Sequence, residues 1–281
     1  MSEVTVGGPD DGPPPGVLRL TVCGSSGSYP GPGGACSGYL VQGGATAVVI
    51  DLGPGVLANL QRHVPLAALD GGVLTHAHPD HWVDLTGLEV AYTYDLGRSG
   101  FPVFGTGETA AKAEVVSGDL APTLDWHDLA DRQRFVIGDL AFETSRTVHY
   151  VETYALRITL ADAPDGPSLA YSADTGPGWS FAAFGAPIDV ALCEATFCAD
   201  MEPAGIAHLS ARQAGTMAAD AGVRHLVLTH LFPGVAHQDA AAEGAAAFGR
   251  PVHVARDGDV FEVDADGALR VVGVESSGAA G

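Results

Sequence analysis

The segment "THAHPDH", residues 75–81, constrains this chain more than any other, because it gathers four potential metal ligands within six positions. These are His76, His78, Asp80 and His81. The apolar run "GGVL" before them predicts a strand, and just past it alternate residues of the extended chain point the same way. The first two histidines can therefore reach one ion together. Pro79 disfavours helix before it, so the aspartate and the last histidine fall where we expect a helix to begin, near Trp82, and can face a second ion.

A purely structural interpretation of this segment also exists. Asp80 alone could serve as a helix N-cap, and a single histidine is more often a surface or core residue than a ligand. Four such residues within six positions have no packing rationale, however. The segment therefore predicts a metal site that coincides with the start of a helix.

Three further candidate ligands close other apolar runs. His149 ends "LAFETSRTVH", Asp174 ends "SLAYSAD" and His230 ends "HLVLTH". Strands would deliver all three to one rim of the sheets, where they can join the first four. Five imidazoles and two carboxylates suit two divalent ions, with zinc as the first choice and manganese or iron as alternatives. The predicted division assigns His76, His78 and His149 to one ion, Asp80, His81 and His230 to the other, and Asp174 to a position between them.

Short apolar runs ending in Gly, Asp or His alternate with helical patterns along the chain. Strands are expected within residues 17–24, 46–53, 71–76, 140–149, 168–174, 189–195 and 225–230. Helices are expected within residues 55–64, 80–94, 107–118, 210–222 and 238–248. Strand-only stretches and strand-helix units together predict an α/β fold in which helices cover mixed sheets.

The length and composition favour one domain. A chain of 281 residues that is 46% apolar can bury one large core, and no long linker interrupts residues 17–273. We expect a disordered leader over residues 1–16 and a disordered tail over residues 274–281. The Gly-, Ser- and Pro-rich residues 24–40 predict a loop near the first strands.

The charge and cysteine content of the chain argue against several partners and compartments. Thirteen basic residues against 34 acidic ones give a formal charge of -21, and Lys112 is the only lysine, so no basic stripe could hold a nucleic acid stably. The four cysteines form no metal-binding pair and are too few for a disulfide scaffold. The start of the chain lacks the features of a signal peptide, and no later run is long enough to span a bilayer. We therefore expect a cytoplasmic protein with no membrane partner.

The ligand pattern and its flanking motifs resemble the metallo-β-lactamase-fold hydrolases, and among them the phosphodiesterase branch near ribonuclease Z. The likeness lies in HxHxDH, the later single histidine, "YSADTGP" and "LTH". It extends to "VIDLGPG", "CEATF" and "HLSARQAG", and so covers most of residues 17–265. The resemblance implies an αββα four-layer sandwich with the metals in a groove at one edge of the two sheets.

The expected reaction follows from the paired ions and from the resemblance. Two divalent ions suit hydrolysis of a phosphodiester by attack of a metal-bridging hydroxide, with Asp80 among the residues that carry the reaction. By resemblance, His208 of "HLS" contacts the phosphate or protonates the leaving oxygen, and Glu194 of "CEAT" orients it. Cys193 stands where the family's HEAT segment has its histidine. The alternative for His208 is a plain polar residue ahead of a helix.

The short segment between His149 and Asp174 bears on the substrate. Only 24 residues separate them, which leaves no room for the tRNA-gripping arm that ribonuclease Z inserts there. A compact, armless member of this branch looks most like the small cyclic-nucleotide phosphodiesterases. The expected substrate is therefore a small anionic diester, with 3′,5′-cyclic AMP or a similar cyclic nucleotide first.

Several alternatives stay open from the sequence. The same dinuclear site would serve an acyl hydrolase, such as a thioesterase or lactonase, or an armless ribonuclease Z-like nuclease. A binding protein that keeps the fold without catalysis is a third class, although a full set of seven ligands argues against it. The sequence also leaves open whether the chain forms a homodimer.

Overall fold

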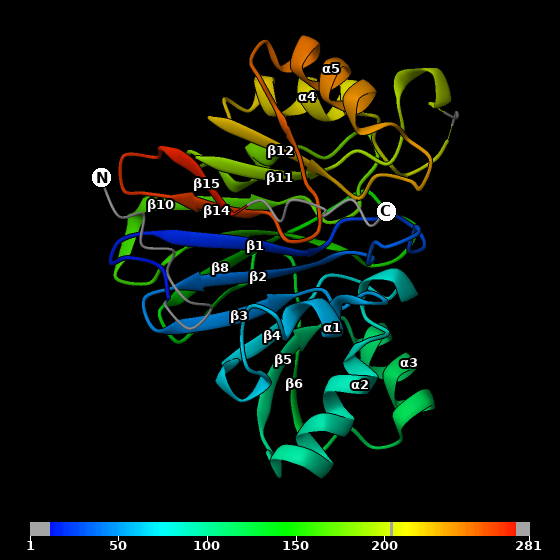
Figure 1. Ribbon diagram of the computed structural model, residues 1–281, viewed down its shortest axis with the longest axis vertical. Coiled ribbons are helices and arrows are strands. Elements are labelled where there is room, and N and C mark those ends of the chain that lie inside the picture. The colour runs from blue at the N-terminus through cyan, green and yellow to red at the C-terminus, as the bar shows by residue number, and fades with distance from the viewer. Residues whose placement is uncertain (1–11, 203–204, 274–281) are drawn as a thin grey trace, which may run out of the picture.

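Two mixed β-sheets stacked face to face form the centre of the protein, and helices cover their outer faces (Figure 1). The computed structural model describes residues 12–202 and 205–273. One sheet has eight strands in the order β15-β14-β1-β2-β3-β4-β5-β6, and the other has seven in the order β13-β12-β11-β10-β9-β8-β7. The predicted αββα four-layer sandwich is confirmed.

The strands and helices have the following bounds. The eight-stranded sheet contains β1 (Leu18–Gly24), β2 (Gly38–Gly43), β3 (Thr46–Ile50), β4 (Gly71–Leu74), β5 (Phe101–Gly105), β6 (Leu124–Asp128), β14 (Val260–Val263) and β15 (Leu269–Gly273). The seven-stranded sheet contains β7 (Arg134–Ile137), β8 (Leu140–Arg146), β9 (Tyr154–Leu160), β10 (Ala163–Tyr171), β11 (Val190–Glu194), β12 (His225–Thr229) and β13 (His253–Val254). The α-helices are α1 (Val56–Leu60), α2 (Leu85–Val90), α3 (Gly107–Ser117), α4 (Ala211–Asp220) and α5 (His237–Phe248). Shorter helical turns are η1 (Leu66–Ala68), η2 (Pro79–His81), η4 (Phe181–Phe184) and η5 (Ala199–Met201), and η3 (Ala91–Leu96) is π-helical.

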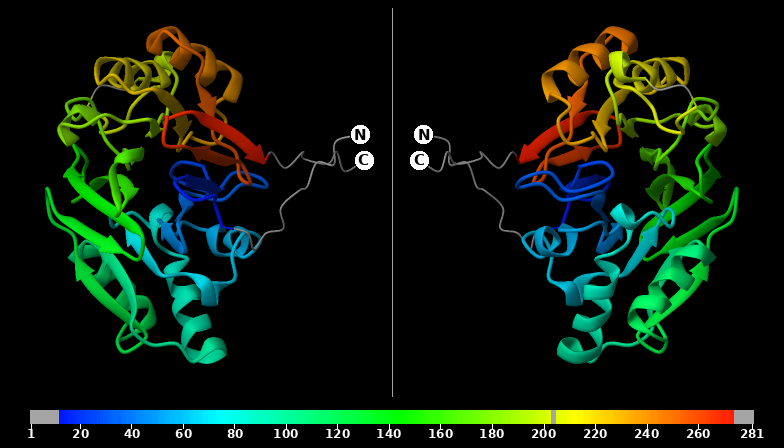
Figure 2. Two further views of the ribbon diagram at one scale, coloured as in Figure 1. Left: turned by 90° about the vertical axis from the view of Figure 1, so that its left-hand side faces the viewer. Right: turned by 90° about the vertical axis from the view of Figure 1, so that its right-hand side faces the viewer.

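Three apolar layers hold the sandwich together. The central layer lies between the sheets and contains large buried side chains such as Tyr39, Phe142 and Tyr171. A second layer joins α4 and α5 to the seven-stranded sheet, and a third joins α1, α2 and α3 to the eight-stranded sheet. Helices α4 and α5 lie at one end of the molecule and α2 lies at the other (Figure 2). Strands covered on both faces are mainly apolar, which accounts for the runs "AVVI" in β3 and "VALC" in β11.

Each sheet is parallel in one part and antiparallel in the rest. Strands β3 to β6 run parallel to one another, and so do β10 to β13. Strand β8 points the same way as β10, because both are antiparallel to β9 between them. The carboxyl ends of β8, β10, β11 and β12 therefore meet at one edge of the seven-stranded sheet.

A glycine allows α4 and α5 to pack closely. A Cβ atom at Gly215 of α4 would lie 2.5 Å from the carbonyl oxygen of Gly244 on α5, which is closer than real Cβ contacts allow. The absence of a side chain at this position lets the two alanine-rich helices form one thin outer layer. Helix α4 begins with a capping box, because the side chains of Ser210 and Gln213 each accept a hydrogen bond from the backbone of the other. This cap fixes the chain just after His208.

The predicted helix start near Trp82 is wrong. The chain makes only the short turn η2 at residues 79–81, and α2 begins at Leu85. The backbone explains the difference, because the carbonyl oxygen of His81 accepts a hydrogen bond from the Leu52 amide, 2.7 Å away, instead of one within a helix. Contact with the segment after β3 thus overrides the local helical pattern.

The predicted loop over residues 24–40 extends too far. Residues 38–40 already belong to β2, where Tyr39 and Leu40 pair with β1 on one side and with β3 on the other. Both side chains are fully buried, so the need to cover them outweighs the turn-forming residues nearby. The single domain over residues 17–273 stays a prediction. Of the predicted disordered ends, residues 1–11 and 274–281 lie outside the described residues.

Across residues 12–202 and 205–273, no helix combines the length and apolarity needed to cross a membrane.

Candidate metal centre

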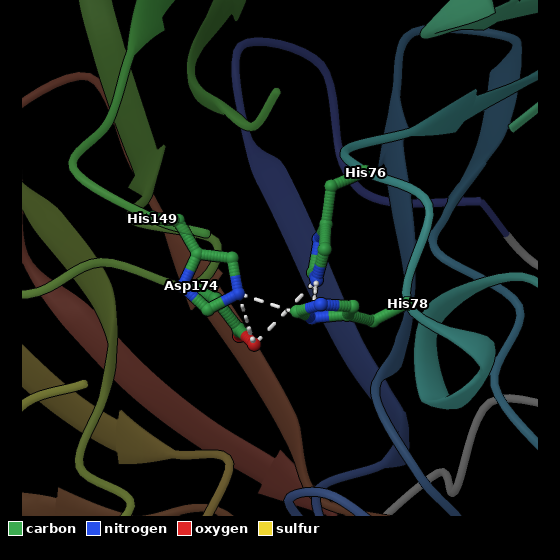
Figure 3. Close-up of side chains that lie close together, drawn as sticks. All are labelled: His76, His78, His149 and Asp174. Atoms are coloured by element: carbon green, nitrogen blue, oxygen red, sulfur yellow. Dashed lines mark hydrogen bonds and ion pairs between the residues drawn. The ribbon is translucent and has the colours of Figure 1, made fainter. Parts of the chain in front are cut away.

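The seven predicted ligands meet at one edge of the two sheets, where several strands end. Strand β4 ends two residues before His76, and β12 ends directly before His230. Strands β8 and β10 each end three residues before a ligand, His149 and Asp174 respectively. His76 and His78 approach the centre from one side, and His149 and Asp174 approach it from the other (Figure 3).

The predicted ligands form two groups. The three-histidine group consists of His76, His78 and His149, and the Asp80 group consists of Asp80, His81 and His230. In the first, Nδ1 of His78 lies 3.2 Å from Nε2 of His76 and 3.0 Å from Nε2 of His149. Three ring nitrogens that converge on one point in this way are typical of a metal site.

The Asp80 group converges in the same manner from both sheets. Oδ2 of Asp80 lies 3.3 Å from Nε2 of His230 and 3.6 Å from Nε2 of His81. The backbone amide of Ser28 donates to the same oxygen, 2.8 Å away, so the glycine-rich loop reaches the site. A Cβ at Gly27 would lie 2.5 Å from the His230 carbonyl oxygen, so this close approach requires glycine.

Asp174 lies between the two groups and turns one oxygen toward each. Its Oδ2 is 3.6 Å from Nε2 of His76 and 3.7 Å from Nε2 of His149. Its Oδ1 is 3.3 Å from Nε2 of His81 and 3.4 Å from Nε2 of His230. This is the arrangement that a carboxylate shared by two ions requires.

Two unpaired atoms test whether a metal fits here. Nε2 of His81 and Oδ1 of Asp174 are buried, yet neither has a hydrogen-bond partner. Leaving such atoms unpaired costs about 1–3 kcal/mol each, and a cation between them would remove that cost. The donor set of imidazole nitrogens and carboxylate oxygens also suits a borderline divalent ion. The residues therefore fit two metal ions, although the ligand roles themselves stay predictions.

The outer ring nitrogens of four histidines are held by hydrogen-bonding partners. Nδ1 lies 3.1 Å from Thr75 Oγ1 in His76, 2.7 Å from Asp51 Oδ2 in His81, 2.9 Å from the Ala207 carbonyl oxygen in His149, and 2.9 Å from Thr196 Oγ1 in His230. Each contact turns Nε2 toward the centre, which is how proteins orient metal-binding histidines.

Asp51 is a site residue that the sequence interpretation left without a role. It closes the wholly buried strand β3 just as Asp174 follows β10, so the same signal of a carboxylate after an apolar run could have found it. Its backbone has a φ of 55°, which is unusual for a residue other than glycine. The strained backbone directs the carboxylate toward Thr75 and His81.

Charges differ between the two groups. Burial lowers the pKa of His76, His78 and His149, so these rings are neutral near pH 7 and can offer a lone pair to an ion. Burial also opposes charge on His81, but the carboxylates of Asp174, Asp51 and Asp80 outweigh it and raise the pKa of His81 well above its usual range.

His208 lies beside the centre and is held by Glu194. Nδ1 of His208 donates to Oε1 of Glu194, 3.0 Å away, and lies 3.9 Å from Oδ2 of Asp174. Burial lowers the pKa of His208, but the charge and hydrogen bond of Glu194 outweigh burial and raise the pKa to about 9. The Glu194 carboxylate is fully buried and also accepts from the backbone of Thr175 and Leu209.

A cavity of about 530 Å³ opens beside His208. Its walls combine apolar side chains, such as Val148, Pro177 and Phe197, with the polar side chains of Glu202, Ser210 and Gln213. The cavity adjoins the candidate metal centre, because His208 lines it and also contacts His149 and His230. Cys193 is fully buried in strand β11 and burial raises the pKa of its thiol, so it does not replace the missing histidine as a polar group of the site.

Comparison with known proteins identifies the family of the chain. Residues 46–231 match the model of a family described as the beta-lactamase superfamily domain. The chain therefore belongs to this superfamily, as a metallo-hydrolase, and the predicted resemblance is confirmed.

Individual relatives and solved structures resemble the chain over most of its length. It is 38% identical over 256 residues to the uncharacterized protein Rv1339 of Mycobacterium tuberculosis, a match that covers 88% of this chain and 92% of that one. It is 30% identical to the probable metallo-hydrolase YhfI of Bacillus subtilis, whose crystal structure superposes with a TM-score of 0.79 over 88% of this chain and 99% of that one. The short form of human tRNase Z, at 18% identity, shares the fold with a TM-score of 0.68 over 86% of this chain and 98% of that one. The chain is also 25% identical over 248 residues to the ribonuclease Z of Mycobacterium bovis, a match that covers 78% of this chain and 88% of that one, so the relation to ribonuclease Z is confirmed.

Proposed function

We propose that this metallo-hydrolase is a dinuclear phosphodiesterase that cleaves a small phosphodiester, with 3′,5′-cyclic AMP or a similar cyclic nucleotide as the first choice of substrate. The observation that carries the proposal is the position of Asp174, whose two oxygens face the two ligand groups while His208 lies beside them. Two divalent ions, with zinc first and manganese or iron as alternatives, would lie on either side of this carboxylate.

The charge of such a site suits an anionic substrate. When bound, two divalent ions polarise a phosphoryl oxygen and activate water. The chain supplies two carboxylates, Asp80 and Asp174, and imidazoles that are neutral once an ion has displaced the proton that the carboxylates favour on His81. The loaded site would therefore keep positive charge and attract a phosphodiester. The same enclosure that buries these ligands excludes bulk water and strengthens the attraction.

His208 is proposed to protonate the leaving oxygen. Its Nδ1 is committed to Glu194, which leaves Nε2 as the ring atom available to a substrate. Because its pKa is raised to about 9, the ring carries a proton near pH 7 and can act as a general acid. Glu194 acts as a positioning residue, because it contacts His208 and is itself fully buried.

The segment between His149 and Asp174 favours a small substrate. All of its residues are described, and strands β9 and β10 account for most of them, so no arm for tRNA extends from it. The cavity beside His208 is of a size that takes a nucleoside, because pockets for small molecules usually have about 300–1,000 Å³. A formal charge of -21 opposes a long polyanion.

A substrate panel tests the proposal. The metal content of the purified protein would be counted, and turnover compared on cyclic AMP, bis(p-nitrophenyl) phosphate, a thioester, a lactone and a β-lactam, with Asp174→Ala as the inactive control. We expect hydrolysis of the two diesters at rates well above those of the acyl compounds. Turnover confined to the acyl substrates would replace the phosphodiesterase with the acyl hydrolase alternative. A cytoplasmic location, the absence of stable nucleic-acid binding and a homodimer stay predictions.

A further inference from the structure

Two buried tyrosines cross between the sheets beneath the candidate metal centre. Tyr39 belongs to β2 of the eight-stranded sheet, and its hydroxyl lies 2.8 Å from Oγ1 of Thr229 on β12 of the other sheet. Tyr171 belongs to β10 of the seven-stranded sheet, and its hydroxyl donates to Oδ2 of Asp51, 3.1 Å away, just past β3 of the first. The two rings pack edge to face with their centroids 5.0 Å apart.

The hydroxyl of each tyrosine contacts a residue that supports a histidine of the Asp80 group. Asp51 accepts, on the same Oδ2, a hydrogen bond from Nδ1 of His81 at 2.7 Å. Thr229 directly precedes His230, whose backbone has a φ of 56°. The crossed pair therefore connects the supports of the two histidines of this group.

The spacing of these two histidines depends on the distance between the sheets. His81 follows β4 of the eight-stranded sheet, and His230 follows β12 of the seven-stranded sheet. Apolar packing between the sheets is non-directional and tolerates small sliding movements, whereas hydrogen bonds fix both distance and direction. The two tyrosine hydroxyls supply fixed points of this kind inside the central apolar layer, where both side chains are fully buried or nearly so.

We infer that Tyr39 and Tyr171 are positioning residues that set the geometry of the Asp80 group across the two sheets. This inference rests on the proposed dinuclear function. The three-histidine group depends less on the pair, because Asp51 reaches it through Thr75, whose hydroxyl contacts both Asp51 oxygens and Nδ1 of His76. His149 of the same group is held instead by the Ala207 carbonyl oxygen. Loss of a tyrosine hydroxyl should therefore weaken one ion more than the other.

The test measures metal binding directly. Metal-free Tyr171→Phe, Tyr39→Phe and the double variant would be titrated with cobalt(II) by calorimetry and by visible absorption. The event that belongs to the Asp80 group is identified as the one abolished in His230→Ala. Tyr92→Phe is the matched control, since Tyr92 is fully buried and its hydroxyl donates to the Leu66 carbonyl oxygen, 3.0 Å away, in the helical layer of α1 to α3.

We expect Tyr171→Phe to weaken the ion of the Asp80 group by about tenfold or more, the usual size of effect for a residue that supports a ligand. Tyr39→Phe should act in the same direction, while the ion of the three-histidine group changes by less than about threefold in either variant. Equal loss at both groups, or the same loss in Tyr92→Phe, would overturn the inference. If the unaltered protein binds two ions but hydrolyses no diester, the proposed function is wrong, while the inference about the tyrosines still stands.

Discussion

The two ligand groups lie side by side, yet the protein surrounds them differently. The three-histidine group contains neutral rings, and His78 is only partly buried. The Asp80 group is buried throughout, and His81 within it contacts three carboxylates, Asp51, Asp80 and Asp174. The first group offers an ion well-placed lone pairs, whereas the second also offers it negative charge. The same edge of the two sheets thus provides two electrostatic environments. Changes to carboxylates should therefore affect the two ligand groups unequally.

Asp174 is the residue on which both groups depend, so its removal should have the largest effect. Asp174→Ala takes one oxygen from each group and leaves His81 and His230 facing each other without the shared carboxylate. We expect kcat/KM on bis(p-nitrophenyl) phosphate to fall by about 1,000-fold or more, with weaker binding of both ions. Metal analysis after dialysis provides the second measurement.

The control for this change is another acidic residue with a histidine partner. Asp125→Ala removes an exposed carboxylate that pairs with His127, 3.2 Å away, and should leave metal content and turnover unchanged. Loss of one ion with full retention of the other in Asp174→Ala would show that the carboxylate serves a single group. The symmetrical role drawn from its two oxygens would then be wrong.

His208 should matter for turnover without belonging to either group. It stacks on His230 with ring centroids 5.5 Å apart and also contacts His149 at 5.0 Å, so it lies beside both. We expect His208→Ala to reduce turnover of cyclic AMP, whose leaving alkoxide needs a proton, by about 100-fold. Loss on a p-nitrophenyl diester should stay below about tenfold, because p-nitrophenolate leaves without help.

Calorimetric titration of His208→Ala with zinc separates this role from metal binding. Two binding events of unchanged affinity are the expected result. If instead an ion is lost, His208 is a ligand together with Asp174 and His230, a grouping that their positions also allow. Equal losses of turnover on good and poor leaving groups would contradict the acid role.

Asp51 distinguishes the groups by charge. Asp51→Asn removes a negative charge next to His81 while preserving the size of the side chain, so the Asp80 group loses both attraction for an ion and the fixed orientation of His81. We expect the affinity of its ion to fall by about 10- to 100-fold. The ion of the three-histidine group should weaken less, because the asparagine can still accept from the Thr75 amide. Metal titration monitored by cobalt absorption measures both, and a uniform loss would contradict the electrostatic difference.

The sequence placed the candidate ligands at one edge of the sheets because most of them follow a strand. HxHxDH is contiguous, and His149, Asp174 and His230 all close apolar runs, so the rule that parallel strands end at one edge was enough to bring them together. The fold class followed from the same alternation of runs and helical patterns. Residues whose place follows from the order of strands along the chain could therefore be identified from the sequence.

The parts that sequence reasoning missed depend on contacts across the fold. Nothing near Tyr39 or Tyr171 indicates that their hydroxyls reach the opposite sheet. The amide of Ser28 enters the site only because a tight loop of positive φ packs on His230. The helix expected near Trp82 does not form there, because the His81 carbonyl oxygen accepts a hydrogen bond from the Leu52 amide. Leu52 is far from His81 in the sequence, so the local pattern does not indicate this contact. Such long-range pairings leave no periodic signal.

Replacement of Lys112 should have the smallest effect on ion affinity, and it should act mainly on one of the two ligand groups. The chain's only lysine donates from α3 to the carbonyl oxygen of Ala77, 3.1 Å away, and Ala77 lies between His76 and His78. Since Lys112 is 43% exposed and also pairs with Glu108, the tether is weak, and Lys112→Met should loosen only the three-histidine group, by about two- to fivefold in ion affinity. Lys112→Arg keeps a donor and should restore most of the affinity. An effect on the Asp80 group of equal size would mean that the two groups move as one unit, because Trp82, next to His81, donates to the same Ala77 oxygen, 3.2 Å away.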